Sequence, residues 1–131
     1  MDRVFLIVAC VFGFLGVAFG AFGSHALRAR LSPERIAQFE IGVRYQLFHT
    51  FAVFAVFFLR AVAPDTTAGS VAGVAFIAGV VVFSGSLYAL ALTGERRWGA
   101  VTPIGGVLLL VGWAALTWAA MTGPLPVTPR F

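Results

Sequence analysis

Long uncharged apolar stretches alternate with short polar segments along the chain. Residues 4–23 carry no charged side chain, and neither do residues 69–92 or 101–121. A helix rises about 1.5 Å per residue, so about 20 residues cross the roughly 30 Å hydrocarbon core of a bilayer. Each of the three stretches therefore predicts a membrane-spanning helix.

A fourth span, at about residues 45–63, is less clearly defined. The uncharged stretch between Arg44 and Arg60 is short for a full crossing, but it is rich in aromatic side chains. Arginines near the ends of a span can extend to the head groups and lengthen the usable segment. Apolar residues also recur at helical spacing upstream. Two arrangements remain open: one long helix over 33–62 that starts at the membrane surface, or a short interfacial helix with a bend near Gly42.

These patterns predict an all-α fold, an integral membrane bundle in a single domain over residues 1–131. The four spans run up and down in antiparallel order, with an amphipathic extension before the second. Thr102 and Pro103 read as the N-cap and first turn of the last span. The proline-rich tail at 124–129 cannot continue that helix. The first apolar stretch is longer than the core of a usual signal peptide, so we expect it to be an uncleaved span.

Composition supports membrane insertion. Apolar residues make up 60% of the chain and charged residues 11%, whereas soluble domains carry about 25% charged residues. All nine basic residues are arginines, and most lie near the ends of apolar stretches. Such residues meet anionic head groups. We therefore expect the lipid bilayer, and no nucleic acid, as a partner. The single cysteine, Cys10, excludes an internal disulfide.

Arginine counts predict the orientation. The two loops that join spans one to two and three to four hold six arginines, against three on the opposite side. Loops rich in arginine stay in the cytoplasm. We expect a multi-pass protein of the cell inner (plasma) membrane with both termini outside the cytoplasm.

Small residues recur along one side of several spans. Close backbone approach favours association between helices in lipid, where the hydrophobic driving force is small. We expect these glycines at helix contacts within the bundle or between copies: Gly13, Gly16, Gly20, Gly23, Gly69, Gly73, Gly79, Gly105 and Gly112.

Polar side chains gather at the arginine-rich end of the predicted bundle, whereas the opposite end offers little beyond Asp65, Thr66 and Thr67. Ionisable groups at membrane depth usually turn inward and find partners. A candidate polar or ligand site therefore comprises His25, Arg28, Arg44, Tyr45, Gln46, His49, Ser84, Ser86, Tyr88 and Thr102.

The two histidines leave three interpretations open: hydrogen bonding between helices, a site for a ligand, lipid head group or proton, or a metal site. His25 and His49 form no HxxxH or HExxH motif, and their ligand set is thin for a metal. The segment around Ser84 and Ser86 lacks a complete GxSxG nucleophile motif. We therefore expect no metal, no cofactor and no catalytic residue, and hence no enzyme.

Several motifs together resemble one known family. They are Gly20–Leu27 (GAFGSHAL), Tyr45–His49 (YQLFH), Phe83–Tyr88 (FSGSLY), Leu92–Gly94 (LTG) and Thr102–Gly106 (TPIGG). In this order and spacing they are similar to the small four-span membrane proteins of unknown function that include transmembrane protein 256. The resemblance covers nearly the whole chain and implies a helical inner-membrane protein without an assigned activity.

Two functions follow as hypotheses. The first is a structural or accessory component of a membrane assembly, acting as a homo-oligomer or within a larger complex. The second is a protein that binds or transports a small molecule, lipid or ion through the polar site.

Overall fold

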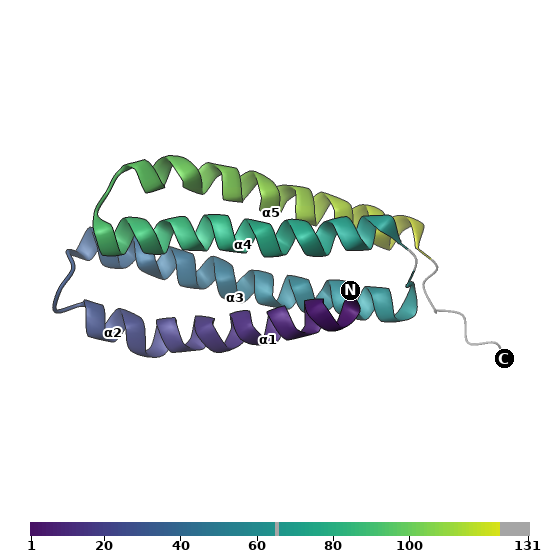
Figure 1. The fold of residues 1–131 in the computed structure, drawn as a ribbon, viewed down its shortest axis with the longest axis horizontal. Helices are drawn as coiled ribbons and strands as arrows, with labels where there is room; N and C mark the ends of the chain where they lie inside the picture. The colour runs from purple at the N-terminus through teal and green to yellow at the C-terminus, as the bar shows by residue number, and fades with distance from the viewer. Residues whose placement is uncertain (65, 124–131) are drawn as a thin grey trace.

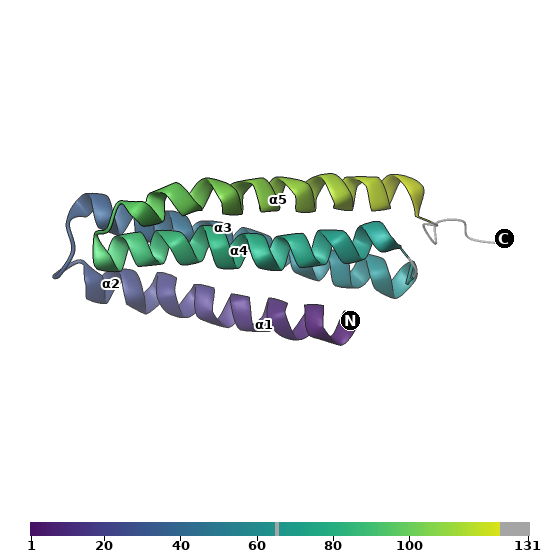
Figure 2. The same cartoon turned by 45° about the horizontal axis from the view of Figure 1, so that its top comes forward.

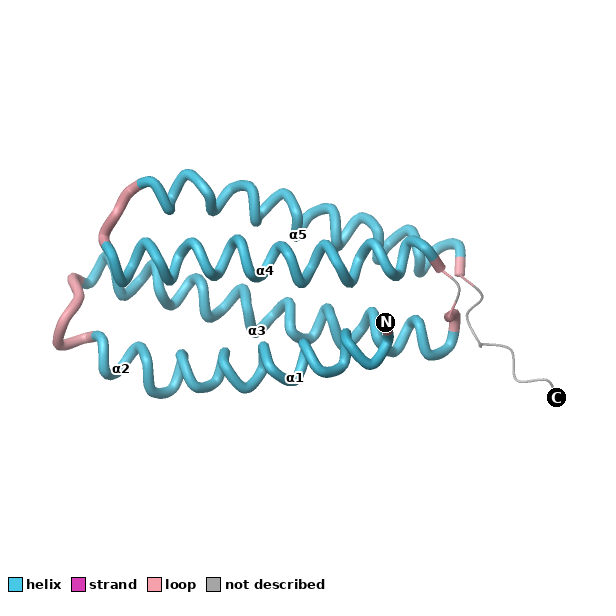
Figure 3. The backbone as a smooth tube through the Cα atoms, viewed as in Figure 1, coloured by secondary structure: helices cyan, strands magenta, loops and turns pink. Residues whose placement is uncertain are grey.

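The structure is a computed structural model that describes residues 1–64 and 66–123. Asp65 and the proline-rich tail, for which the sequence predicts an end to the last helix, lie outside the described residues. The described chain is helical apart from short connections (Figure 3). Four of its helical segments are long and apolar enough to cross a membrane, which confirms the predicted fold class.

The first span is built from three consecutive elements that form one continuous helix over Asp2–Leu27. They are the α-helix α1 (Asp2–Ala18), the π-helical turn η1 (Phe19–Gly23) and the short helix α2 (Ser24–Leu27). In the π-turn the amide of Ser24 bonds to the carbonyl of Phe19, five residues back. The wider turn changes the direction in which the following side chains point.

The remaining spans are single helices: α3 (Pro33–Val62), α4 (Thr67–Thr93) and α5 (Arg97–Thr122). Of the two alternatives left open for the second span, the structure has the single long helix, because α3 continues through Gly42. The Ser32 side chain accepts a hydrogen bond from the Arg35 amide at its start, as an N-cap residue does. At about 1.5 Å per residue, α3 exceeds the hydrocarbon core, so its first turns extend into the head-group layer.

The predicted start of the last span was wrong. α5 begins at Arg97, and Pro103 lies inside it. Gly94, in the left-handed conformation at φ 72°, ends α4, and the chain re-enters a helix within three residues. A proline in the second turn removes one backbone bond without ending the helix. The Thr102 hydroxyl donates to the Trp98 carbonyl, 3.3 Å away, instead of capping a helix.

The helices form an antiparallel row in which α3 and α4 occupy the middle (Figures 1 and 2). α1 packs along α3, and α5 packs chiefly along α4. Figure 1 shows both connections 28–32 and 94–96 at one end of the bundle, here called the loop end. The N-terminus lies at the other end, here called the outer end, beside the connection between α3 and α4.

Glycines of the first span lie against α3. A Cβ on Gly16 would lie 2.5 Å from the Leu47 side chain, and one on Gly20 would lie 3.1 Å from Val43. Gly23 faces the Phe39 ring at 3.2 Å, and Gly13 faces Thr50 at 3.5 Å. The absence of side chains at these positions lets the two helices approach closely.

A second set of glycines brings α4 and α5 together. A Cβ on Gly79 would lie 2.6 Å from Leu109, and one on Gly112 would lie 2.5 Å from the Phe76 ring. Gly105 is the tightest position, because its Cβ would meet the backbone of Phe83, with the Phe83 Cα 2.6 Å away.

Two further glycines of α4 accommodate large side chains at the outer end. A Cβ on Gly73 would lie 2.5 Å from the Phe5 ring of α1. A Cβ on Gly69 would lie 3.3 Å from the Arg60 side chain of α3. Both positions therefore contact helices earlier in the chain.

Candidate functional site

Gln46 joins three helices in the interior of the bundle. Its Nε2 donates to the Phe12 carbonyl of α1 at 2.8 Å, and its Oε1 accepts from the Tyr88 hydroxyl of α4 at 2.7 Å. Gln46 is only 4% exposed, so each bond replaces water that the interior excludes. The amide therefore acts as a structural link between α1, α3 and α4.

Ser84 and Ser86 of α4 bond on opposite sides of that helix. The Ser84 hydroxyl donates to the Gly42 carbonyl of α3 at 2.7 Å, while the Ser86 and Thr102 hydroxyls lie 2.6 Å apart and join α4 to α5. Both serines are buried. A hydroxyl engaged in this way holds helices together. Within the described residues, the bonded partners of these two hydroxyls are backbone carbonyls and a threonine hydroxyl, none of which is a base that would activate a nucleophile.

Both ring nitrogens of His49 have partners. Nδ1 lies 2.7 Å from the Tyr45 carbonyl, and Nε2 lies 3.1 Å from the Trp113 indole Nε1. A carbonyl only accepts and an indole N–H only donates, so Nδ1 carries the proton and Nε2 accepts. This hydrogen bond ties α5 to α3, although α5 otherwise packs on α4.

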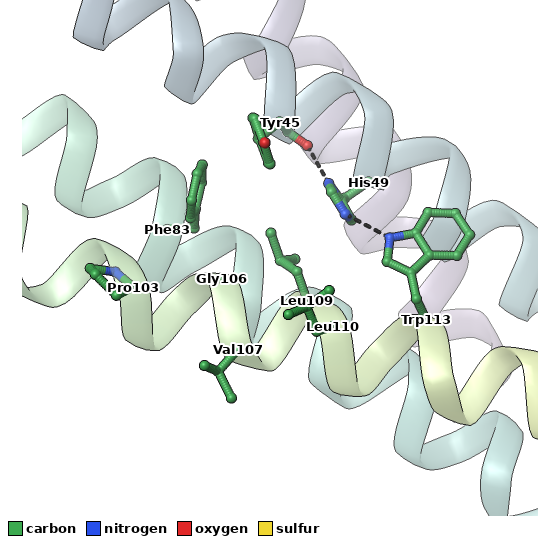
Figure 4. A pocket seen from close by; sticks show the side chains of 9 residues that line it. All are labelled: Tyr45, His49, Phe83, Pro103, Gly106, Val107, Leu109, Leu110 and Trp113. Carbon is green, nitrogen blue, oxygen red and sulfur yellow. Dashed lines mark hydrogen bonds between the residues drawn. The ribbon is translucent and has the colours of Figure 1, made fainter.

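Beside this histidine, α3 and α5 enclose a groove with Phe83 of α4 at its base. The cavity measures about 440 Å³. Figure 4 shows Tyr45 and His49 on one side and the helix α5 on the other. Its lining is mainly apolar and aromatic: Tyr45, His49, Phe83, Pro103, Gly106, Val107, Leu109, Leu110 and Trp113. Such a surface suits a hydrocarbon chain or ring system.

The structure does not gather all the predicted site residues into one place. His25 and Arg44 are exposed, and Arg28 lies 3.8 Å from Glu40 at the surface. No bond joins the two histidines within the described part of the chain: His25 is exposed, whereas His49 is buried and bonds within α3 and to α5. The linear count of residues could not show which way each side chain points after the π-turn of the first span.

Sequence reasoning missed a polar cluster at the outer end. Arg60 donates to Asp2 at 2.5 Å and to the Ser70 hydroxyl at 2.5 Å, and its side chain is only 11% exposed. Its guanidinium also lies 6.0 Å from the centre of the Phe5 ring. Polarity is therefore present at both ends of the bundle. The signal available in the sequence was an acid at position 2 and an arginine near the end of the second span.

A family model described as "Protein of unknown function (DUF423)" matches residues 19–106. The chain belongs to this family. The resemblance to the transmembrane protein 256 group is thereby confirmed, since that label is a name for the same family.

Bacterial relatives match over most of their length. The chain is 43% identical to the UPF0382 inner membrane protein YgdD of Escherichia coli (strain K12), covering 88% of this chain and 87% of the relative. It is 35% identical to the UPF0382 membrane protein YwdK of Bacillus subtilis (strain 168), covering 91% and 97%. No solved structure matches the chain. Family membership therefore identifies a membrane protein, and the names of its relatives give no specific activity.

Proposed function

We propose that the protein acts without a chemical step, as a structural or accessory component of an assembly in the inner membrane. The observation that carries this proposal is the use of the interior polar groups. Gln46, His49, Ser84 and Tyr88 all bond to neighbouring helices, so the side chains best placed for chemistry serve the framework. The E. coli relative's name as an inner membrane protein supports the location.

The sides of the bundle, where the helices face away from its core, suit contacts within the bilayer. Large apolar side chains on different helices are exposed, among them Phe14 at 75%, Phe51 at 69% and Leu110 at 69%. The connections between described spans are short. Contacts with another protein would therefore be made largely by helix faces, through packing.

Site-specific photo-crosslinking in living cells tests this role. A photoreactive residue replaces Phe14, Phe51, Val74 or Leu110, one on each span, and the products are resolved by mass. We expect one face to give a discrete protein adduct of reproducible mass while the others give lipid adducts. Lipid adducts alone from all four positions, together with a 13.9 kDa monomer in mild detergent, would contradict the proposal.

A second candidate function is the binding of an apolar small molecule or lipid chain, and the groove between α3 and α5 favours it. Gly106 lines this groove, and a Cβ there would meet only the Phe83 ring at 3.9 Å. Leucine at position 106 would therefore fill the groove without forcing the helices apart.

Gly85 provides the matched control, since a Cβ at this position has no atom within 4 Å. Purified wild type, Gly106→Leu and Gly85→Leu are compared for co-purifying apolar compounds by extraction and mass spectrometry. Binding in the groove predicts that a compound is lost from Gly106→Leu and retained by Gly85→Leu. Equal content in all three proteins would remove this candidate.

A further inference from the structure

A small cavity at the loop end lies between the start of α3, the end of α4 and the start of α5. It measures about 190 Å³ and is lined by charged and polar residues that include Glu34, Arg35, Gln38 and Arg96. It is separate from the groove of Figure 4, with which it shares no lining residue. Because α3 is longer than the hydrocarbon core requires, we expect its first turns, and this cavity with them, at the level of the lipid head groups.

Two arginines give the cavity an anion-binding side. Arg35 donates through Nε to the Ala91 carbonyl at 2.6 Å, and this bond fixes the guanidinium over the end of α4. Gly94 lies beside this guanidinium, since a Cβ there would be 3.5 Å from the Arg35 Cζ, an ordinary van der Waals contact. Within the described residues, the terminal nitrogens of Arg35 form no hydrogen bond. Arg96 adds a second guanidinium to the lining. Paired guanidiniums match a phosphate in charge and in donor geometry.

The same lining also offers acceptors. Gln38 Oε1 is buried and has no hydrogen-bond partner within the described part of the chain. A buried acceptor without a donor is costly, so this oxygen favours a ligand that brings an N–H or O–H donor. The Glu34 carboxylate lies in the same lining and favours a donor with a positive charge.

We propose that this cavity binds the head group of a phospholipid that carries a primary ammonium, the phosphoethanolamine class. The phosphate would lie between Arg35 and Arg96, and the ammonium would donate to Gln38 Oε1 and Glu34. The acyl chains then extend along the bundle into the bilayer. Basic pockets between membrane helices at the head-group level are established lipid sites. This inference is independent of the proposed accessory role.

The test measures lipid adducts of the full chain by native mass spectrometry. The delipidated protein is titrated with detergent micelles that contain phosphatidylethanolamine or phosphatidylcholine with identical acyl chains. Both lipids carry the phosphate, but the quaternary ammonium of choline has no N–H to donate. We expect a first adduct at least about tenfold tighter with phosphatidylethanolamine, since bonds to charged groups are the strong ones. Equal affinity for the two lipids would overturn the proposal.

Substitutions separate the site from general attraction to the membrane surface. Arg96→Gln should weaken the first phosphatidylethanolamine adduct about tenfold, and Gln38→Leu should reduce the preference over phosphatidylcholine. Arg97→Gln is the matched control, because Arg97 pairs with Glu95 at 2.6 Å with a side chain 76% exposed and does not line the cavity. Equal losses in Arg96→Gln and Arg97→Gln would show surface attraction alone and contradict a built site.

Soluble competitors identify the source of the head group. Free phosphoethanolamine or inorganic phosphate at millimolar concentration should leave the lipid adduct in place, because a lipid also gains from acyl contacts with the helices. Displacement of the lipid by either compound would overturn a lipid site and indicate a site for a soluble phosphate. Arg35→Gln is a less direct variant, since Arg35 also bonds to Ala91, so the test depends on Arg96 and Gln38.

Discussion

At the scale of single residues, the bond between His49 and Trp113 is the clearest case of one side chain fixing another helix. The ring of His49 is 7% exposed, and its two nitrogens bond to Tyr45 and Trp113. Because α5 packs mainly on α4, this bond is a specific connection from α5 across the groove to α3. The histidine thereby closes one wall of the groove.

Replacing Trp113 with phenylalanine tests that bond. A smaller aromatic ring remains, but the donor to His49 Nε2 is lost, and we expect the free energy of unfolding to fall by about 1 kcal/mol. Trp118→Phe makes the same chemical change on α5 at a position 62% exposed and should cost less. Both variants are unfolded by denaturing detergent in mixed micelles. Equal losses would mean that ring size, and not the hydrogen bond, sets the stability.

Gln46 and Tyr88 allow a direct measurement of coupling between α3 and α4. Gln46→Leu and Tyr88→Phe each remove one side of a 2.7 Å bond, so in a double-mutant cycle we expect a coupling energy of about 1 kcal/mol. Tyr45 is the control, since its ring is 40% exposed and lines the groove. A cycle of Gln46→Leu with Tyr45→Phe should give a coupling energy near zero, and a value as large as that for Tyr88 would contradict the assignment.

At the scale of helices, glycines set the distance between α4 and α5. A methyl group on Gly105 would meet the Phe83 backbone, with Cα 2.6 Å away, and backbone atoms of a packed helix cannot rotate aside. The same methyl on Gly85, on the open side of α4, meets no atom within 4 Å. The two glycines therefore differ in packing although both lie in the middle parts of long helices.

Alanine at these two positions should have opposite effects. We expect Gly105→Ala to lower the free energy of unfolding by about 1–3 kcal/mol, because overpacking separates the helices. Gly85→Ala should leave stability unchanged or raise it by up to about 1 kcal/mol, because alanine favours the helix. Unfolding curves in denaturing detergent measure both. A loss in Gly85→Ala equal to that in Gly105→Ala would show that glycine is needed there for another reason.

Sequence patterns located the helices well because hydropathy and length are local properties. Their ends were less accurate: α5 starts at Arg97 although Thr102 and Pro103 resemble a helix start. The candidate site was harder still, since it depends on rotation about each helix axis. The π-turn at Phe19–Gly23 alters that rotation for His25, and the partner of His49 is a tryptophan two helices away. No spacing in the sequence encodes either relationship.

At the scale of the whole molecule, charge is distributed unequally between the two ends. The loop end carries exposed arginines, including Arg28, Arg30, Arg96 and Arg97. At the outer end, Arg60 is held inside the bundle by Asp2 and Ser70. The exposed positive charge thus lies mainly at the loop end, and from the positive-inside rule we expect this end to face the cytoplasm.

Cysteine labelling in intact cells tests this orientation. Cys10→Ser removes the native thiol, and a single cysteine then replaces Ala29 in the first loop or Pro64 in the connection between α3 and α4, both exposed. A membrane-impermeant maleimide should label Pro64→Cys in intact cells and Ala29→Cys only after permeabilisation. The reverse pattern would place the arginine-rich loops outside the cytoplasm. It would also place the phospholipid cavity beside Arg96 in the opposite leaflet, because that cavity and Ala29 lie at the same end of the bundle.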